Sequence, residues 1–454
     1  MLDRGRFTRV GANGIGNPRS QVAQSMSFFD GHLYLGVTHP KGEDAGDAAR
    51  ILRYEPDKEG WSTVYESPLV QADENAVVRD VYRGEMSQSL GRLKDDTALV
   101  PRYRGYRCMA QFENRNAKGG SLFVSTLSHW GSQLLCTDDG EHFEVASEPG
   151  LGNDSVLSFR TMLTFNRKLF VAPVGTVSGG VMDRNFGDIA LLYVSDDPAG
   201  GRWELAMEPG FGDPTNKSVF SMAVFNGHLY AGTGNPERGF EVWKTRARGK
   251  PPFKWTRVIT QGAGRYNLNE VATTMAAFGD AVYVGSGIPG LGYDKAHDVG
   301  PAAAELIRID ADDRWELIVG SPRFSPNGLK LPLSLQEPGF DDPENSALWA
   351  MAEHDGVLYV GTHHCGSFKK ALAGRPELDG GFQLWASADC EDWTAITLDG
   401  FGDPYATGVR TLVSTPQGLF LGTSTHREIE KFWKFRTGAA GPPGEGGLEV
   451  WLGR

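Results

Sequence analysis

The sequence is poor in cysteine and has no long apolar run. Its four cysteines, Cys108, Cys136, Cys365 and Cys390, are scattered without a CxxC pair, which argues against a disulfide framework or a structural zinc site. The N-terminal stretch MLDRGRFTRV has no apolar signal core, and no segment approaches the ~18 apolar residues of a membrane span. These absences predict a cytoplasmic location and no membrane partner.

Basic residues are outnumbered as well. Lysine and arginine total 45 against 57 acidic residues, which gives a net charge of −12 and a pI of about 5.4. Because phosphate contacts need a basic surface, nucleic acid is excluded as a main partner. We expect no nucleotide cofactor. Hydrophobic residues make up 40% of the 454 residues, enough for a large core, and the oligomeric state is left open.

Glycine, in contrast, is abundant, and it accompanies an internal repeat. Seven stretches resemble one another: HLYLGVTHP (32–40), SLFVSTLSHW (121–130), KLFVAPVGT (168–176), HLYAGTGNP (228–236), AVYVGSGIP (281–289), VLYVGTHHCG (357–366) and GLFLGTSTH (418–426). Each follows a run with methionine or leucine at one register position: Met26, Met109, Met162, Met222, Met275, Met351 and Leu412. A third strand-like run comes after each stretch and a fourth comes after six of them, as in FEVWKT and WTRVI. The seventh unit ends at LEVWLGR without its fourth run, and FTRVG at residues 7–11 has the missing pattern.

Four short β-type segments repeated seven times are typical of a propeller. We therefore predict an all-β, seven-bladed β-propeller with four-stranded blades. The N-terminal strand would complete the last blade and close the ring, so that residues 1–454 form a single domain. Such closure pairs the strand edges that an open array would leave exposed.

The turns between repeats share a glycine pattern, as in PGLGND, PGFGDP and GFGDP. We interpret them as structural turns rather than calcium loops, because the acidic position varies. Two further segments, CTDDGEHF and VSDDPAGGRW, resemble the Asp-box turns of sialidase-like propellers and concern the fold rather than function. In the first, the residues that match are Asp138, Gly140 and Phe143, with Cys136 in place of the usual serine.

Histidines gather where the second strand of several repeats ends. Those in repeats one, two, six and seven, which ring closure would make consecutive, are His39, His129, His363, His364 and His426. As candidate catalytic residues we take His39, His129, His364 and His426. They could bind a metal ion such as Fe(II), zinc or copper, or they could transfer protons or hydrogen-bond a substrate. Unrelated exposed histidines are the alternative.

A second set of candidates lies two residues before the register methionine or leucine. That position holds Gln24, Arg107, Arg160, Phe220, Thr273, Trp349 and Arg410. Three arginines at equivalent positions could project into a channel mouth and grip an anion with a planar fork. Ion pairs between blades are their alternative role. As substrate-binding candidates we take Gln24, Arg107, Arg160, Trp349, Arg410 and Tyr405.

Three insertions interrupt the repeat, at residues 66–104, 320–337 and 427–446. The first contains DVYRGEMSQSLGRLKDD, which has a helical composition. Long loops in a compact fold are more often functional or disordered than idle. The insertions could form a lid over the mouth, or they could be loose decoration.

The GFGDPxN turn, the Met-rich first strand and the LYVGT second strand resemble the propeller portion of bacterial enzymes that build cyclophanes. The resemblance covers the repeat units only, and the calcium-binding repeat domain that accompanies that propeller is missing here. It implies a Friedel–Crafts alkylation that joins an alkyl halide to a resorcinol ring, with basic and tyrosyl groups acting on halide and phenol.

These patterns favour a small-molecule enzyme of the transferase or lyase type, acting in biosynthesis on an anionic or phenolic substrate at the channel mouth. The arginines would hold negative charge, a histidine would transfer a proton and the insertions would exclude water. Two alternatives stay open. One is a non-catalytic propeller that binds a peptide or glycan, and the other is a metal-dependent lyase or oxygenase that uses the histidines.

Overall fold

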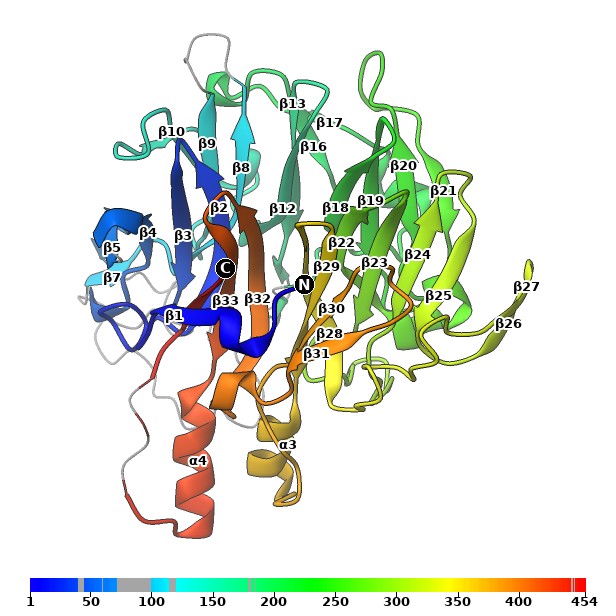
Figure 1. Ribbon diagram of the computed structural model, residues 1–454. Coiled ribbons are helices and arrows are strands. Elements are labelled where there is room, and N and C mark those ends of the chain that lie inside the picture. The colour runs from blue at the N-terminus through cyan, green and yellow to red at the C-terminus, as the bar shows by residue number, and fades with distance from the viewer. Residues whose placement is uncertain are drawn as a thin grey trace. The chain divides into compact units, whose positions relative to one another are not determined.

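The computed structural model is built almost entirely of antiparallel strands (Figure 1). It describes residues 1–39, 45–58, 60–71, 99–113, 120–178, 181–183, 185–441, 444 and 446–454. The chain divides into two compact units, each described by itself below. The smaller unit comprises 19–214 and 250–252, and the larger comprises 1–18, 215–249 and 253–454.

Within its described residues, the smaller unit contains three antiparallel meanders in which each strand pairs with the next. The strands are β2 (Val22–Phe29), β3 (His32–Thr38), β4 (Arg50–Glu55) and β5 (Gly60–Glu66); β8 (Gly105–Phe112), β9 (Ser121–Leu127), β10 (Leu134–Thr137) and β11 (Glu144–Val145); β12 (Ser158–Phe165), β13 (Lys168–Val174), β16 (Tyr193–Ser195) and β17 (Glu204–Leu205).

The described part of the larger unit contains four such meanders. Their strands are β18 (Ser218–Phe225), β19 (His228–Gly234), β20 (Val242–Thr245) and β21 (Thr256–Ile259); β22 (Val271–Phe278), β23 (Ala281–Gly287), β24 (Leu306–Asp310) and β25 (Trp315–Val319); β28 (Asn345–His354), β29 (Val357–His364), β30 (Leu384–Ser387) and β31 (Thr394–Thr397); β32 (Ala406–Thr415), β33 (Gly418–Thr425), β34 (Val450–Gly453) and β1 (Phe7–Gly11).

The N-terminal strand pairs with the C-terminal one, as the missing fourth run predicted. Phe7 lies opposite Gly453 and Thr8 opposite Leu452 in an antiparallel ladder. Phe7 is buried against Phe401, with 5.4 Å between the ring centroids. A 2.7 Å ion pair joins Arg9 to Glu449. The two ends of the chain therefore share one meander.

The second strands carry the core. They consist of Leu, Val, Tyr and Phe with few polar residues, and nearly all of their side chains are buried. Continuous apolar runs of this kind are expected of strands that are covered on both faces. All seven predicted second strands are confirmed. The repeated meanders make this an all-β, propeller-like architecture.

Each first strand has a register shift at the position singled out in the sequence. The ladder shifts between Leu348 and Ala350, and again between Val409 and Thr411. The residues at these shifts in the seven meanders are Gln24, Arg107, Arg160, Phe220, Thr273, Trp349 and Arg410. A bulge bends its strand and re-aims the side chain that it carries. The same kind of backbone bulge therefore positions the side chain at this register in every first strand.

The glycine turns between repeats are short left-handed turns. In the turn before β18, Gly210, Phe211 and Gly212 have φ values of 64°, 54° and 83°. Glycine enters this region freely, whereas the central phenylalanine is strained there, so two glycines flank one apolar residue. The asparagine that follows is structural too: Asn216 donates to the buried carboxylate of Glu241 at 2.9 Å. At the equivalent position of another repeat, the side-chain amide of Asn345 donates to the side-chain oxygen of Gln383 at 2.8 Å.

The Asp-box segment at the end of β10 is a turn, but its predicted register was wrong. Asp139, not Asp138, accepts hydrogen bonds from the backbone N–H groups of Glu141 and His142, both at 2.8 Å. Thr137, not Cys136, accepts from the backbone of Gly140 at 2.9 Å. The side chain one position earlier lies on the opposite face of the strand and cannot reach this turn.

Two helices that were not predicted, α3 (Gly366–Ala373) and α4 (Arg427–Thr437), lie side by side in the larger unit (Figure 1). Arg436 of α4 donates to the carbonyl oxygens of Ala371 and Leu372 at the end of α3. The insertion at 427–446 thus contributes α4. The described residues contain no helix that is long and apolar enough to cross a membrane.

The other insertions form small hairpins. β26 (Arg323–Ser325) and β27 (Gly328–Lys330) pair within 320–337, and β6 (Leu69–Gln71) pairs with β7 (Leu99–Pro101) within 66–104. The helical segment expected in 66–104 lies among residues 72–98, outside the described residues. A last hairpin joins β14 (Thr176–Ser178) and β15 (Val181–Asp183).

Candidate functional site

The run VLYVGTHHCG ends strand β29 and begins helix α3. His363 and His364 are the last two residues of the strand, and both are buried. Cys365 is fully buried and precedes the first turn of the helix. Because neighbouring residues of a strand point to opposite faces, the two histidines have separate surroundings.

His363 packs against one side chain carried by a bulge, and a second bulge residue lies over that side chain. Its ring stacks on the indole of Trp349, with 4.1 Å between centroids and 23° between planes. The guanidinium carbon of Arg410 lies 5.3 Å from the centre of the same indole, a cation–π distance. Gly408 makes room for this arrangement, since a Cβ there would lie 2.6 Å from the Trp349 ring. Trp349 and Arg410 are both partly exposed.

His426, at the start of α4, completes this cluster. Phe368 of α3 lies between the histidines, with its ring 5.1 Å from that of His426 and 6.2 Å from that of His363. Hydroxyl groups face the imidazoles: Ser346 is 2.9 Å from His363 Nδ1, and Ser424 is 3.2 Å from His426 Nε2.

Burial keeps both of these imidazoles neutral. It lowers the pKa of His363 to about 3, and the electrostatic interaction with its neighbours His426, His364 and Arg410 acts in the same direction. It also lowers the pKa of His426 to about 4. A neutral imidazole can donate one hydrogen bond and accept another, and it accepts a proton when negative charge develops beside it. We call Trp349, His363, Phe368, Arg410 and His426 the aromatic–arginine cluster.

His364 faces a different set of partners. The backbone N–H of Gly366 donates to His364 Nδ1 at 3.2 Å, so Nδ1 is an acceptor and the hydrogen of the ring lies on Nε2. This Nε2 lies 3.1 Å from Asp342, which also accepts from Gln383 at 2.7 Å. Burial raises the pKa of Asp342, but the bond from His364 and its neighbours outweighs it, and the net shift is downward. Both ring nitrogens of His364 thus form hydrogen bonds within the protein and stabilise the local structure. A catalytic role for His364 stays a prediction.

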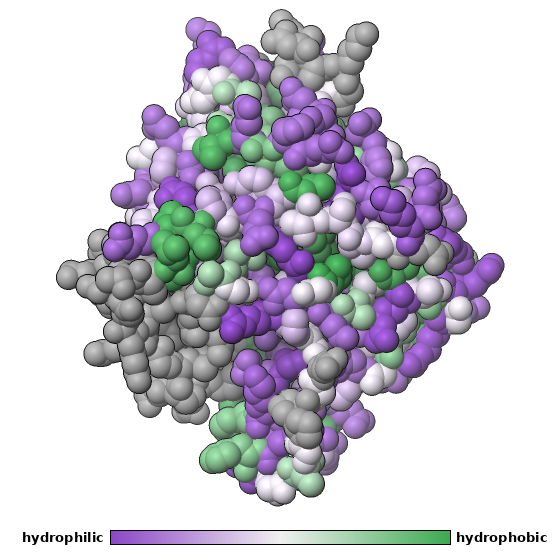
Figure 2. Space-filling view, turned by 90° about the vertical axis from the view of Figure 1, so that its left-hand side faces the viewer, coloured by the Kyte–Doolittle hydropathy of each residue, from purple (hydrophilic) through white to green (hydrophobic). Residues whose placement is uncertain are grey.

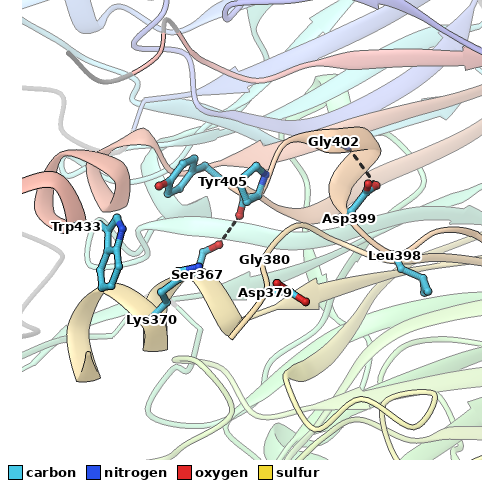
Figure 3. Close-up of a pocket in the computed structure, with 10 residues that line it drawn as sticks. Ser367, Lys370, Asp379, Gly380, Leu398, Asp399, Gly402, Tyr405 and Trp433 are labelled. Atoms are coloured by element: carbon cyan, nitrogen blue, oxygen red, sulfur yellow. Dashed lines mark hydrogen bonds between the residues drawn. The ribbon is translucent and has the colours of Figure 1, made fainter. Parts of the chain in front are cut away.

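A cavity of about 450 Å³ opens beside the cluster, between α3, α4 and the turn before β32 (Figure 3). Its lining is mixed: Ser367 and Lys370 come from α3, Trp433 from α4, and Tyr405 from the turn. The cavity is also lined by Asp379, Gly380, Leu398, Asp399, Gly402 and Pro404. Burial raises the pKa of Tyr405, so its phenol is protonated at neutral pH.

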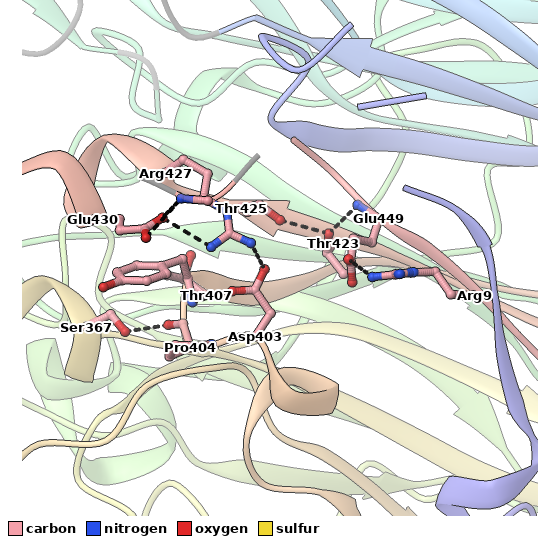
Figure 4. A network of polar contacts seen from close by, with 12 residues as sticks. Arg9, Ser367, Asp403, Pro404, Thr407, Thr423, Thr425, Arg427, Glu430 and Glu449 are labelled. Atoms are coloured by element: carbon pink, nitrogen blue, oxygen red, sulfur yellow. Dashed lines mark hydrogen bonds and ion pairs between the residues drawn. The ribbon is translucent and has the colours of Figure 1, made fainter. Parts of the chain in front are cut away.

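An ion-pair network fixes α4 against the turn that carries Tyr405 (Figure 4). Arg427 donates to Asp403 at 2.7 Å and lies 3.4 Å from Glu430. Its guanidinium carbon is 5.4 Å from the centre of the Tyr405 ring. The backbone N–H of His426 donates to the Tyr405 carbonyl at 2.9 Å. Tyr405, His426 and α4 therefore form one connected arrangement.

The remaining histidine candidates lie in the smaller unit. His39 is fully buried, with Nε2 3.2 Å from the Ser20 hydroxyl, and burial lowers its pKa to about 4. Arg104 lies 2.9 Å from His129 Nε2, and the backbone N–H of His39 donates to the Arg104 carbonyl. Arg104 therefore connects the two histidines.

The three bulge candidates of the smaller unit differ in burial. Arg107 is buried and donates to Asn185 at 3.3 Å, whereas Gln24 and Arg160 are partly exposed. Whether these residues and the two histidines share an opening with the aromatic–arginine cluster stays a prediction.

Metal binding by the histidines gains no support from the residues that the structure describes. No group of three or more His, Cys, Asp and Glu side chains that could hold a metal ion occurs in the described ranges of the chain. His364 has one carboxylate partner, Asp342, and His39 lies 3.9 Å from Asp47. Two ligands fall short of the three protein ligands of a catalytic zinc site.

Comparisons with known proteins are limited to solved structures, since no family model and no curated protein matches the chain. A GH74 xyloglucanase from Xanthomonas campestris is 13% identical, with a TM-score of 0.46 over 92% of this chain and 52% of that one. The present chain thus spans about half its length. YCF48 from Cyanidioschyzon merolae is 12% identical, with a TM-score of 0.47 over 98% of both chains. SapL1 lectin, in complex with alpha methyl fucoside, is 12% identical, with a TM-score of 0.40 over 83% of this chain and 96% of that one. At these values the matches assign no function.

Proposed function

We propose that the seven meanders are the four-stranded blades of one closed propeller, and that the chain is an enzyme acting on a small anionic or phenolic molecule. The ladder between β1 and β34 supports closure, because it joins the two ends of the chain in one meander. The single observation that carries the enzymatic proposal is the meeting of Trp349, Arg410 and His363, two bulge residues and a histidine from neighbouring meanders.

The chemistry of the cluster suits a phenol or an aromatic anion. Arg410 stays charged at every physiological pH and can hold an oxyanion or a leaving anion. Trp349, which stacks on His363 and lies under Arg410, supplies an aromatic wall beside the charge. The neutral imidazoles of His363 and His426 can accept a proton as negative charge develops. Alkylation of a phenolic ring needs these same roles, so the reaction implied by the sequence resemblance stays within the proposal.

The cavity of Figure 3 supports a second binding region beside the cluster. Tyr405 and Trp433 would contact the part of a substrate that lies there. A non-catalytic role in binding a glycan remains the alternative, because stacking tryptophans serve both purposes. Transferase chemistry, a role in biosynthesis and a cytoplasmic location are predictions from the sequence.

The proposal can be tested with 4-nitrophenol, whose ionised form absorbs at longer wavelength. We expect the wild-type chain to bind the phenolate and to lower the apparent pKa of the bound probe, read as absorbance against pH. Arg410→Lys keeps the charge but loses the planar fork, so binding should weaken about thirtyfold, or about 2 kcal/mol. His426→Asn leaves Arg410 in place, so it should reduce the pKa change of the probe without abolishing it.

The matched control is Arg257→Lys. Arg257 also lies over a tryptophan, 5.5 Å from the centre of Trp243, but on the outer strand β21. It should leave binding unchanged. Equal binding by wild type and Arg410→Lys would reject the cluster as the site. An effect that follows Tyr405→Phe alone would locate binding in the cavity instead.

A further inference from the structure

In the insertion at residues 320–337, charged side chains face the protein and apolar side chains face the solvent. In the β26–β27 hairpin, Arg323 lies opposite Lys330 and Phe324 lies opposite Leu329. Alternation along a strand places the two cations on one face and the two apolar side chains on the other. The cations are on the face that packs against the protein, and the apolar pair faces outward.

Strong polar contacts hold the inner face. Arg323 donates to both carboxylate oxygens of Glu305, each at 2.9 Å, and Glu305 is fully buried. Lys330 donates to the Trp315 carbonyl at 2.7 Å and to Glu316 at 3.0 Å. Both cations also lie over the Trp315 ring, at 5.6 and 5.0 Å. These contacts fix the outward direction of the apolar side chains.

The outward side is unusually apolar. We call its five large side chains the apolar arm: Phe324, Leu329, Leu331, Leu333 and Leu335. Phe324 is 83% exposed and Leu335 is 87% exposed. In Figure 1 the hairpin projects beyond β24 and β25. By comparison, the face drawn in Figure 2 is largely hydrophilic, with hydrophobic residues in separate patches. The largest contiguous apolar patch on a soluble protein often has a function, and larger ones mark interaction sites.

We propose that the apolar arm is a homodimer interface, at which the arm of one copy packs against the arm of a second copy. The segment FSPNGLKLPLSLQ has one charged residue, Lys330, and that residue points inward. In a chain of net charge −12, two copies repel each other, and they repel least where both surfaces lack acids. An uncharged arm offers nothing to a strongly charged partner, and it lacks the exposed lysine and arginine that flank membrane-binding faces.

The exposed apolar area of the arm is large enough for an interface with a second copy of the chain. A phenylalanine and four leucines at these exposures offer on the order of 500 Å² per copy. Two arms together would bury on the order of 1,000 Å², the lower bound for a specific interface. Leu333 and Ser334 also donate backbone hydrogen bonds to Leu317 and Ile318 of β25, at 2.9 and 3.1 Å, so the arm is anchored to the outer strand of its meander.

Sedimentation velocity of the full chain, from about 1 to 100 µM, tests the proposal. We expect a concentration-dependent dimer, and a dissociation constant at least tenfold higher for the double variant Phe324→Ser with Leu335→Ser. Both side chains are exposed, so at concentrations where the wild type is monomeric the thermal unfolding curve should not change. Phe435→Ser on α4 is the matched control, because Phe435 is 88% exposed and lies outside the arm. It should dimerise like the wild type.

Two results would overturn the proposal. One is a wild-type chain that stays monomeric at the highest concentration. The other is a dimer that the double variant forms as tightly as the wild type. A monomer that floats with neutral phosphatidylcholine vesicles, and loses this in the double variant, would assign the arm to a lipid surface and reject the dimer.

Discussion

The bulged position two residues before the register methionine or leucine is where the repeats differ most in chemistry. A register shift occurs there in every first strand, and the methionine or leucine that follows is buried or nearly so. The bulge itself carries arginine, tryptophan, glutamine, threonine or phenylalanine. Because the bulge absorbs the irregularity, its side chain can change without disturbing the strand pairing. In the larger unit this brings Arg410 over the ring of Trp349, which itself stacks on His363.

The buried histidine of this cluster should make stability depend on pH. Burial lowers the pKa of His363 to about 3, whereas an unfolded histidine titrates near 6.5. Between these values the unfolded chain binds more protons, so the free energy of unfolding falls as the pH drops below about 6.5. His363→Phe keeps an aromatic ring against Trp349 but cannot titrate. Its stability loss from pH 7 to pH 5 should be smaller than that of wild type by about 2 kcal/mol.

Urea denaturation followed by circular dichroism at pH 7 and pH 5 measures this difference. The comparison uses the change with pH within each protein, so a constant effect of the substitution on stability cancels. Identical pH dependence in the two proteins would show that His363 is protonated in the folded state or titrates normally there.

At the scale of elements, the sequence predicts the strands well and the insertions poorly. Each second strand is a continuous run of apolar and β-branched residues, and its repetition identified all seven. The bulge position has a constant offset of two residues from the register methionine or leucine, so the sequence locates the position but does not predict a bulge there. Helices α3 and α4 were missed because they occur once each, inside loops, where no repeat aligns them.

The choice between adjacent histidines shows why the site was only partly predictable. His363 and His364 are adjacent residues of the same type, so the sequence does not distinguish their roles, and His364 was the predicted catalytic residue. Strand alternation sends His363 to Trp349 and His364 to Asp342. Which face carries the cluster depends on the neighbouring meander, and the spacing of residues along one chain does not contain this information. The apolar arm was missed as well, since a leucine-rich loop looks like ordinary core in a sequence.

The N-terminal strand is the element whose removal should be most damaging for its length. Deleting residues 1–12 removes the ladder with β34, the burial of Phe7 and the ion pair of Arg9 with Glu449. The exposed edge of β34 would then be free to pair with other chains, so solubility and melting temperature should both fall.

The matched control is Arg9→Gln, which removes only the ion pair. The Arg9 side chain is 52% exposed, so this pair is worth about 1 kcal/mol or less. A deletion variant that melts and dissolves like Arg9→Gln would show that β1 is dispensable.

At the scale of the whole molecule, the question is whether the two compact units unfold together. In a closed propeller every blade is supported by two neighbours, so no part can melt without exposing the edges of the rest. Scanning calorimetry of the full chain should therefore show one cooperative transition. The deletion of residues 1–12 opens the last meander, and it should lower the midpoint and broaden or split that transition.

Two separate transitions in the wild-type chain, at midpoints that move independently in Phe7→Ala, would mean that the units fold as separate domains. The closed ring, and with it the expectation that candidates from both units share one opening, would then be wrong.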